Sequence, residues 1–185
     1  MKKYGNIFGL SIFLLFSFMP ITALAEGRTK STSATLACGN AALITRTTYL
    51  VRPDVLSDQV LSQRLIWRNI KTNQEKELNI DGEYVIKHVP DERKVLDAAI
   101  QMLVCEKSTQ GQYYFYVFYY CTDDEERGFC ASGKVEFGRY LREDGAPLIK
   151  GPRRQRVTRR EAHIIKSFGL GLYGKSDVIS LKSVL

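Results

Sequence analysis

The chain has few of the residues on which most hydrolytic and metal chemistry depends. Among 185 residues only 2 are histidines, His88 and His163, and the 4 cysteines form no C-x-x-C pair. A Ser/His/Asp arrangement would need one of these two histidines, and neither lies beside a recognisable nucleophile motif. A zinc site would lack its usual paired ligands. The sequence therefore predicts neither a catalytic triad nor a metal centre, and it indicates no cofactor.

The chain also lacks a hydrophobic run of the roughly 20 residues that a bilayer-spanning helix needs. Its longest apolar stretch, Ile7 to Met19, follows Lys2 and Lys3 and precedes Ala23-Leu24-Ala25. A charged start, a short apolar core and small residues before the cut are the parts of a secretory signal peptide. We predict a signal peptide over residues 1–25 and a periplasmic protein, with secretion into the medium as the alternative.

Charge gives little support to nucleic-acid binding. The net charge of the whole chain is +7, and removal of residues 1–25 takes away two lysines and no acid. The remaining basic excess is modest, and an exported protein rarely meets nucleic acid. With 44% hydrophobic and 25% charged residues, the composition is that of a globular protein. We expect a protein partner and no insertion into a membrane.

The four cysteines all follow the predicted cleavage site: Cys38, Cys105, Cys121 and Cys130. An even number of cysteines in an exported chain favours disulfides, and four allow three pairings. We predict a bridge between Cys121 and Cys130, which closes a short loop. A second bridge, Cys38 with Cys105, would tie the N-terminal segment to a central strand. Each is expected to stabilise the fold by about 2 to 4 kcal/mol.

Runs of β-branched and aromatic residues separated by polar turns dominate the rest of the chain. They predict strands over residues 43–51, 64–70, 77–80, 84–89, 99–105, 112–121, 134–141 and 178–181. Residues 112–121 are aromatic on both faces, which indicates a central strand covered on both sides. We predict a mainly β fold, a single-domain antiparallel sheet arranged as a meander or sandwich over residues 38–185. Residues 26–37 are small and polar, and we expect them to form a flexible leader.

Two segments carry helix signals. Thr158 and Glu161 match the capping box S/T-x-x-E, and Gly169 suits the end of the helix that would follow. This predicts one short C-terminal helix. Pro90-Asp91-Glu92 suit the first turn of a second short helix that would run to about Asp97.

Residues 169–176 match the phosphate-binding pattern G-x-x-x-x-G-K-S. That motif requires a preceding strand and a following helix within a larger sheet. Here it follows the predicted helix and has only a short tail after it. We interpret it as a glycine-rich connector.

The main functional hypothesis concerns the loop between Cys121 and Cys130. A loop closed by a disulfide loses less entropy when it binds, so it can present charges and an aromatic ring to a partner efficiently. Small exported domains with few catalytic groups are more often binding modules than enzymes. We predict a non-catalytic inhibitor that blocks a partner enzyme or toxin, in the manner of immunity proteins. Its partner-binding residues would be Asp123, Asp124, Glu125, Glu126 and Phe129.

Two alternatives stay open. Arginine forks pair well with anions, so the basic segment before the predicted helix could bind an anionic envelope polymer or assembly partner. Its residues are Arg153, Arg154, Arg156, Arg159 and Arg160. The other alternative is a hydrolase with a pair of carboxylates, because 20 acidic residues contain many candidate pairs.

Overall fold

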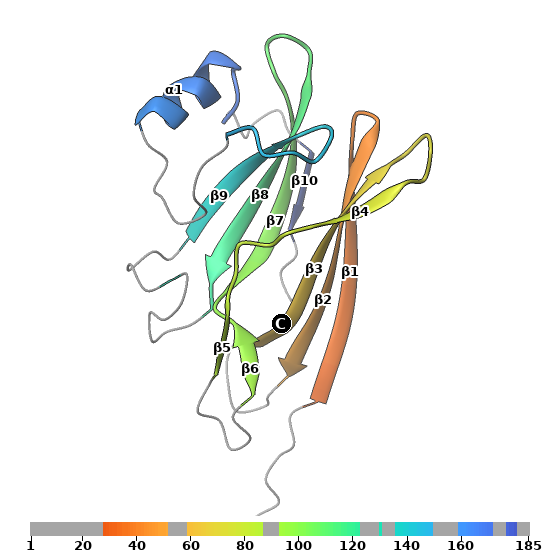
Figure 1. The fold of residues 1–185 in the computed structure, drawn as a ribbon, viewed down its shortest axis with the longest axis vertical. Helices are drawn as coiled ribbons and strands as arrows, with labels where there is room; N and C mark the ends of the chain where they lie inside the picture. Colours follow the sequence, from red (N-terminus) through yellow and green to blue (C-terminus); the bar gives the residue numbers. More distant parts are fainter. Residues whose placement is uncertain are drawn as a thin grey trace, which may run out of the picture.

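The computed structural model describes residues 28–51, 59–86, 93–122, 130, 136–149, 159–171 and 177–180. Their strands form two four-stranded sheets and one two-stranded sheet, all antiparallel (Figure 1). One short helix accompanies them in this part of the chain. The predicted mainly β, antiparallel fold with a short C-terminal helix is confirmed. The predicted signal peptide lies outside the described residues.

The first sheet is a meander of four successive strands in the order β1-β2-β3-β4. They are β1 (Arg28–Cys38), β2 (Ala41–Val51), β3 (Gln59–Asn69) and β4 (Glu75–Leu78). Alternation along β1 and β2 places Leu36, Cys38 and Leu43 in the core. The turn between these strands contains Gly39, whose φ of 65° is the left-handed conformation that glycine adopts readily.

The existence of β1 corrects one prediction. A flexible leader over residues 26–37 is wrong for residues 28–37, because they pair with β2 along its whole length, from Arg28 opposite Val51 to Cys38 opposite Ala41. Most side chains of β1 before Leu36 are exposed, since the strand lies at the sheet edge. Polar Ser and Thr side chains therefore reduce the stability of this strand little, and the strand forms by pairing with β2 although its sequence lacks an apolar pattern.

The second sheet has the order β10-β7-β8-β9. Its strands are β7 (Ala98–Lys107), β8 (Tyr113–Cys121), β9 (Glu136–Arg142) and β10 (Asp177–Ser180). The aromatic strand β8 is central, as predicted. Its inner face packs into the core, where Tyr119 stacks on Phe137 with ring centroids 4.8 Å apart. Its outer face carries Tyr114 and Tyr116, which belong to a separate cluster.

The helix α1 (Arg159–Ser167) covers part of that outer face. It starts immediately after Thr158 and is followed by Gly169 with a φ of 66°, so the predicted helix and its end are confirmed. Phe168 packs 5.7 Å from Tyr114, measured between ring centroids, and its carbonyl accepts a hydrogen bond from the Thr109 N–H. Within the described residues, no helix is long and apolar enough to cross a membrane.

A short pair of strands, β5 (Tyr84–Ile86) and β6 (Lys94–Leu96), lies beside the two large sheets. The helical turn predicted from Pro90 to Asp97 is wrong for residues 94–96, which form β6. Val95 and Leu96 are fully buried, and this burial together with the pairing to β5 outweighs the helix-start signal.

The two large sheets share one core, consistent with a single domain. Apolar residues from β1, β2 and β3 pack against residues from β7, β8 and β9. The predicted Cys38–Cys105 disulfide is present, and it joins the two sheets covalently. Gln63 joins them by hydrogen bonds: its side chain binds both the N–H of Ile100, at 2.7 Å, and the carbonyl of Ile100, at 3.0 Å. Ile100 lies at an irregularity in β7, where such backbone groups need a partner.

Candidate functional site

The molecule has two candidate regions, at opposite ends of β7 and β8. The hairpin end carries the turns at residues 39–40, 70–74, 108–112 and 143–146. The loop end carries β5, β6 and the Cys121–Cys130 disulfide. At this end Ala98, the first residue of β7, pairs with Cys121, the last residue of β8. In Figure 1 the turns of the hairpin end gather at the top, and β5 and β6 lie low in the molecule.

A cavity of about 490 Å³ opens at the hairpin end. Both sheets contribute to it, and its lining combines aromatic rings with carboxamides, a guanidinium and carboxylates. The residues that line it include Trp67, Asn69, Gln112, Tyr113, Arg142, Glu143 and Asp144. A concave site with convergent polar groups is the usual form of a ligand-binding site.

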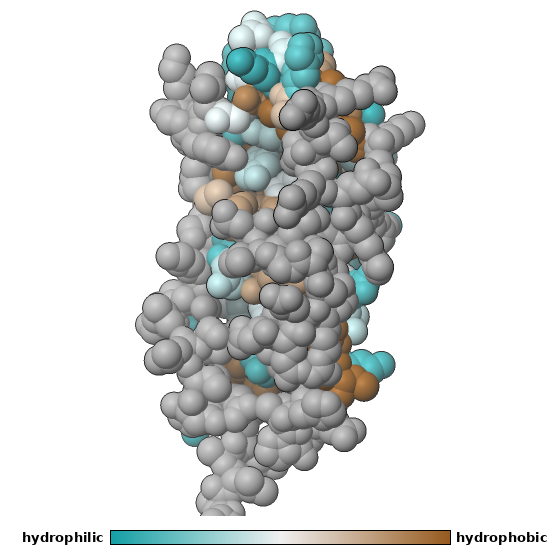
Figure 2. All heavy atoms as spheres, turned by 90° about the vertical axis from the view of Figure 1, so that its left-hand side faces the viewer, coloured by the Kyte–Doolittle hydropathy of each residue, from teal (hydrophilic) through white to brown (hydrophobic). Residues whose placement is uncertain are grey.

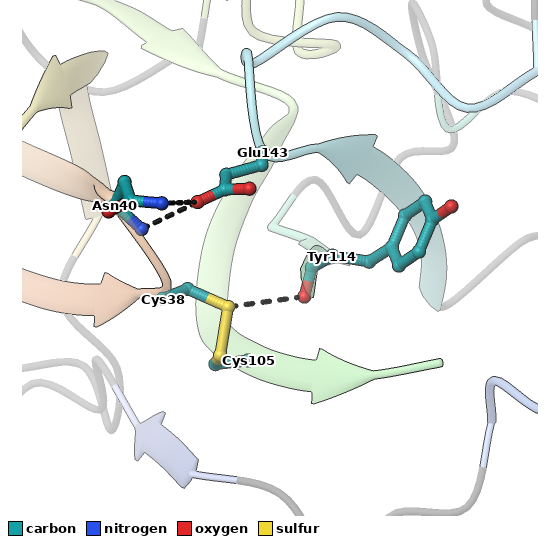
Figure 3. Close-up of a disulfide and its surroundings, with 5 residues drawn as sticks. All are labelled: Cys38, Asn40, Cys105, Tyr114 and Glu143. Atoms are coloured by element: carbon teal, nitrogen blue, oxygen red, sulfur yellow. Dashed lines mark hydrogen bonds between the residues drawn. A yellow bond between two sulfur atoms is a disulfide. The ribbon is translucent and has the colours of Figure 1, made fainter. Parts of the chain in front are cut away.

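Glu143 holds this end together. Its Oε1 accepts hydrogen bonds from the backbone N–H of Asn40, at 2.5 Å, and from the side-chain Nδ2 of Asn40, at 3.1 Å. Its carbonyl oxygen accepts a 2.7 Å bond from Trp67 Nε1. Figure 3 shows the two bonds to Asn40 just beyond the Cys38–Cys105 disulfide. One residue after β9 therefore fixes both the β1–β2 turn and the only tryptophan of the chain.

Close packing at Gly39 and Gly145 also shapes the cavity. A Cβ on Gly39 would lie 2.8 Å from the Tyr113 ring, and one on Gly145 would lie 2.9 Å from the Trp67 ring. Both glycines have positive φ values, 65° and 77°. Larger residues would be strained in conformation and in contact, so glycine lets the turns approach the aromatic walls.

Lys76 covers the Trp67 ring, with Nζ 4.7 Å from the ring centroid, and donates to the carbonyl of Asp144 at 2.5 Å. On the outer face of the second sheet, the Tyr114 hydroxyl donates to Gln112 Oε1 at 2.8 Å. Burial raises the pKa of the Tyr114 hydroxyl above its ordinary value, and the positive charge of Arg142 partly opposes that shift. The walls of the cavity are thus fixed by contacts within the protein.

At the loop end, Asp97 organises the base of the disulfide loop. Its carbonyl accepts a 2.6 Å hydrogen bond from the Thr122 N–H and lies 3.3 Å from the Sγ of Cys130. The carboxylate of Asp97 accepts a 2.6 Å bond from the N–H of Glu83. Asp97 is fully buried, so one fixed residue contacts both ends of the loop and the residue before β5.

Exposed apolar side chains lie near this base. Tyr84 and Ile86 of β5 are 55% and 47% exposed, and Tyr120, next to Cys121, is 38% exposed. In the side view of Figure 2, apolar surface lies low in the molecule, at the height of β5 and β6, and hydrophilic surface lies at the top. Exposed aromatic side chains beside a constrained loop are features of protein-binding surfaces.

The structure leaves the predicted binding residues without a placement. Asp123, Asp124, Glu125, Glu126 and Phe129 lie outside the described residues, as do Arg153, Arg154 and Arg156. Arg159 and Arg160 begin α1, and only their backbone is described. Both predicted disulfides are present, Cys38–Cys105 and Cys121–Cys130.

Sequence reasoning missed the cavity and the exposed pair on β5. One signal was available: in an antiparallel sheet, alternate turns lie at the same end. The polar turns at Gly39-Asn40, Lys71–Gln74 and Arg142–Gly145 would then have been grouped, with the single tryptophan beside them. The close approach of Trp67 to Glu143 had no local signal.

The described residues include no group of three His, Cys, Asp or Glu side chains placed to hold a metal ion. Their two clusters of polar contacts, around Glu143 and around Asp97, fix turns and leave neighbouring side chains exposed. No protein-family model, no curated protein and no solved structure matches this chain.

Proposed function

We propose that the protein is an exported, non-catalytic binding module that blocks a partner enzyme or toxin with its loop end. It would act in the periplasm after loss of the signal peptide at residues 1–25. Two disulfides are consistent with an oxidising, exported location. The partner-binding residues would be those of the disulfide loop: Asp123, Asp124, Glu125, Glu126 and Phe129.

The observation that carries this proposal is the way the loop is held. Its ends are joined by a disulfide and rest on the buried Asp97, through Thr122 on one side and Cys130 on the other. Such a loop loses little conformational entropy when a partner binds. A partner would therefore meet a loop whose base is already fixed.

The neighbouring surface supports a protein partner. Glu83 hydrogen-bonds to the same Asp97, and the next residue is the exposed Tyr84. Protein interfaces typically combine an aromatic centre with a charged rim. Tyr84 and Ile86 would supply the apolar centre, and the four acidic residues of the loop would supply the rim.

The test begins with capture. Immobilised oxidised protein, residues 26–185, is exposed to periplasmic and neighbouring-cell extracts, and bound proteins are identified by mass spectrometry. We expect one stoichiometric, salt-resistant partner whose activity falls when the protein is added. A double charge reversal in the loop, Asp123→Lys with Asp124→Lys, should abolish capture while the thermal midpoint stays nearly unchanged.

The matched control is the reversal of two exposed acids on β4, Glu75→Lys with Glu77→Lys, which changes the net charge equally. This variant should still capture the partner. Equal loss in both double variants, or a captured partner whose activity is unchanged, would overturn the proposal. Capture of only an anionic polymer, lost in moderate salt, would also overturn it in favour of the arginine segment.

A further inference from the structure

The outer edge of the first sheet is an interaction surface that the proposed function does not use. β1 is the edge strand of this sheet, and within the described residues it pairs only with β2. In Figure 1 it forms the right-hand margin of the molecule. β10 lies close to β1 but pairs with β7. The side of β1 that faces away from β2 therefore carries backbone groups that no described strand uses.

The turn between β1 and β2 fixes which residues of β1 face this edge. Cys38 and Ala41 flank a two-residue turn in which Gly39 has a φ of 65°, and the flanking residues of such a hairpin exchange hydrogen bonds. The pairing continues without a bulge to Arg28, so every second residue back from Cys38 bonds to β2. The residues between them direct their N–H and carbonyl groups away from β2. They are Thr29, Ser31, Ser33, Thr35 and Ala37.

All five of these residues are exposed. Their side chains lie on the outer face of the sheet, because Leu36 and Cys38 point into the core and successive residues of a strand point to opposite faces. An exposed edge of this length that contains no proline is a template on which another strand can pair.

The sequence of this edge is nearly symmetric about Thr32. Residues 29–35 read Thr-Lys-Ser-Thr-Ser-Ala-Thr, so a second β1 that runs antiparallel places Thr29 opposite Thr35 and Ser31 opposite Ser33. In this register both members of each pair direct their backbone groups toward the other strand, as a hydrogen-bonded pair requires. The same contacts repeat on the other side of the axis, which is the form of a two-fold symmetric interface.

The side chains of two copies are also compatible in this register. Serine and threonine directly opposite one another form a favourable cross-strand pair. Ser31 already makes such a pair with Thr48 of β2, with the two hydroxyl oxygens 3.2 Å apart. The charged Lys30 would lie opposite Ala34 of the second copy, whose small side chain leaves room for it. Like charges therefore do not lie opposite each other between residues 29 and 35.

We propose that the protein forms a two-fold symmetric dimer in which the β1 edges of two copies pair antiparallel, centred on Thr32. The first sheets of the two copies then form one continuous sheet. The symmetry of residues 29–35 favours a second copy over a strand of another protein. Because the paired strands run in opposite directions, the two loop ends lie at opposite ends of the dimer, and both remain accessible to the partner of the proposed function.

The test is sedimentation velocity of the oxidised mature protein, residues 26–185, from micromolar to millimolar concentrations. We expect a monomer–dimer equilibrium. Ser33→Pro removes an N–H that faces the edge and none that bonds to β2, so it should abolish the dimer while the far-UV circular dichroism stays unchanged. The matched control Ser33→Ala keeps this N–H and should keep the dimer.

A pair of charged variants tests the register without using proline. Ser31→Lys with Ser33→Asp places a lysine directly opposite an aspartate at both symmetric contacts. Thr29→Asp with Ser31→Lys has the same net charge and the same spacing along the strand, but its opposite charges do not face each other. We expect the dissociation constant of the first variant to be about tenfold lower than that of the second.

Three results would overturn the proposal: a protein that is monomeric even at millimolar concentration, a dimer that survives Ser33→Pro, and equal dissociation constants for the two charged variants. A monomer whose capture of a protein partner is lost in Ser33→Pro would instead assign the edge to a strand of that partner. Self-association is measured on the purified protein, so its failure leaves the loop-end proposal, which is tested by capture, unaffected.

Discussion

The two ends of the molecule are each fastened by one disulfide, but the two bridges join different things. At the hairpin end, Cys38–Cys105 connects β1 to β7 and so links the two sheets across a sequence separation of 67. At the loop end, Cys121–Cys130 closes a separation of only 9. A bridge between distant segments restricts the unfolded chain more than a local one does.

This difference matches the surfaces at the two ends. The hairpin end holds a cavity whose walls come from both sheets, so it requires the sheets to keep one relative position. The loop end needs only a fixed base for one loop, which Asp97 provides. The long-range Cys38–Cys105 bridge therefore supports a concave site between the sheets, and the short-range Cys121–Cys130 bridge fixes the base of one loop.

The largest expected effect is on stability when each bridge is removed. In the chain-entropy estimate, Cys38→Ala with Cys105→Ala costs about 4 kcal/mol, and Cys121→Ala with Cys130→Ala costs about 2.5 kcal/mol. Urea unfolding of the two variants, each with its other bridge oxidised, measures both values. Only the first variant should also change the Trp67 fluorescence. Equal losses, or a larger loss at the loop end, would contradict the comparison.

Gln63 offers a second way to test how the sheets are joined. Gln63→Leu replaces the buried carboxamide with an apolar side chain of similar size, which removes the acceptor used by the Ile100 N–H and the donor used by its carbonyl. Because these groups are buried, we expect a loss of about 3 kcal/mol in the free energy of unfolding. Chemical denaturation measures it.

The control for this substitution is Arg64→Leu, at the next residue of β3, where the side chain is exposed. It should change stability by no more than about 0.5 kcal/mol. A loss for Gln63→Leu as large as that for the hairpin-end bridge would mean that the sheets are held as firmly by hydrogen bonds as by the disulfide.

Much of the fold could be predicted because its signals are local. The runs of β8, the capping box before α1 and Gly169 each act over a few residues, and the paired cysteines required only an even count and a choice of pairing. β1 escaped prediction because its polar residues owe their structure to pairing with β2. β6 escaped because burial of Val95 and Leu96 depends on the surrounding sheets.

The cavity could not be predicted in the same way. Its two organising contacts join residues far apart in sequence, 103 residues between Asn40 and Glu143 and 76 between Trp67 and Glu143. No periodicity or spacing in the chain encodes such contacts. The disulfide loop was recognisable because its cysteines, acids and phenylalanine are adjacent in sequence. The loop end is thus a local feature of the sequence, and the hairpin end is a product of the fold.

The smallest expected effect comes from an ion pair on the exposed face of the first sheet. Arg64 binds Glu77 with a 3.0 Å hydrogen bond from Nε and a second from the same guanidinium. These hydrogen bonds lower the pKa of the Glu77 carboxyl below its ordinary value, and the charge of Arg64 acts in the same direction. A lowered folded-state pKa stabilises the fold above the ordinary carboxyl pKa, and this contribution is lost as the pH falls through the folded-state value.

Glu77→Gln should therefore reduce stability slightly at neutral pH, and the difference from the unaltered protein should shrink in acid and in high salt. Urea unfolding at several pH values measures it, with Arg64→Gln and the double variant completing the cycle. A difference that grows as the pH falls would contradict the stated direction of the pKa shift. A loss comparable to that of Gln63→Leu would mean that an exposed ion pair within one sheet stabilises the fold as much as the buried hydrogen bonds that join the two sheets.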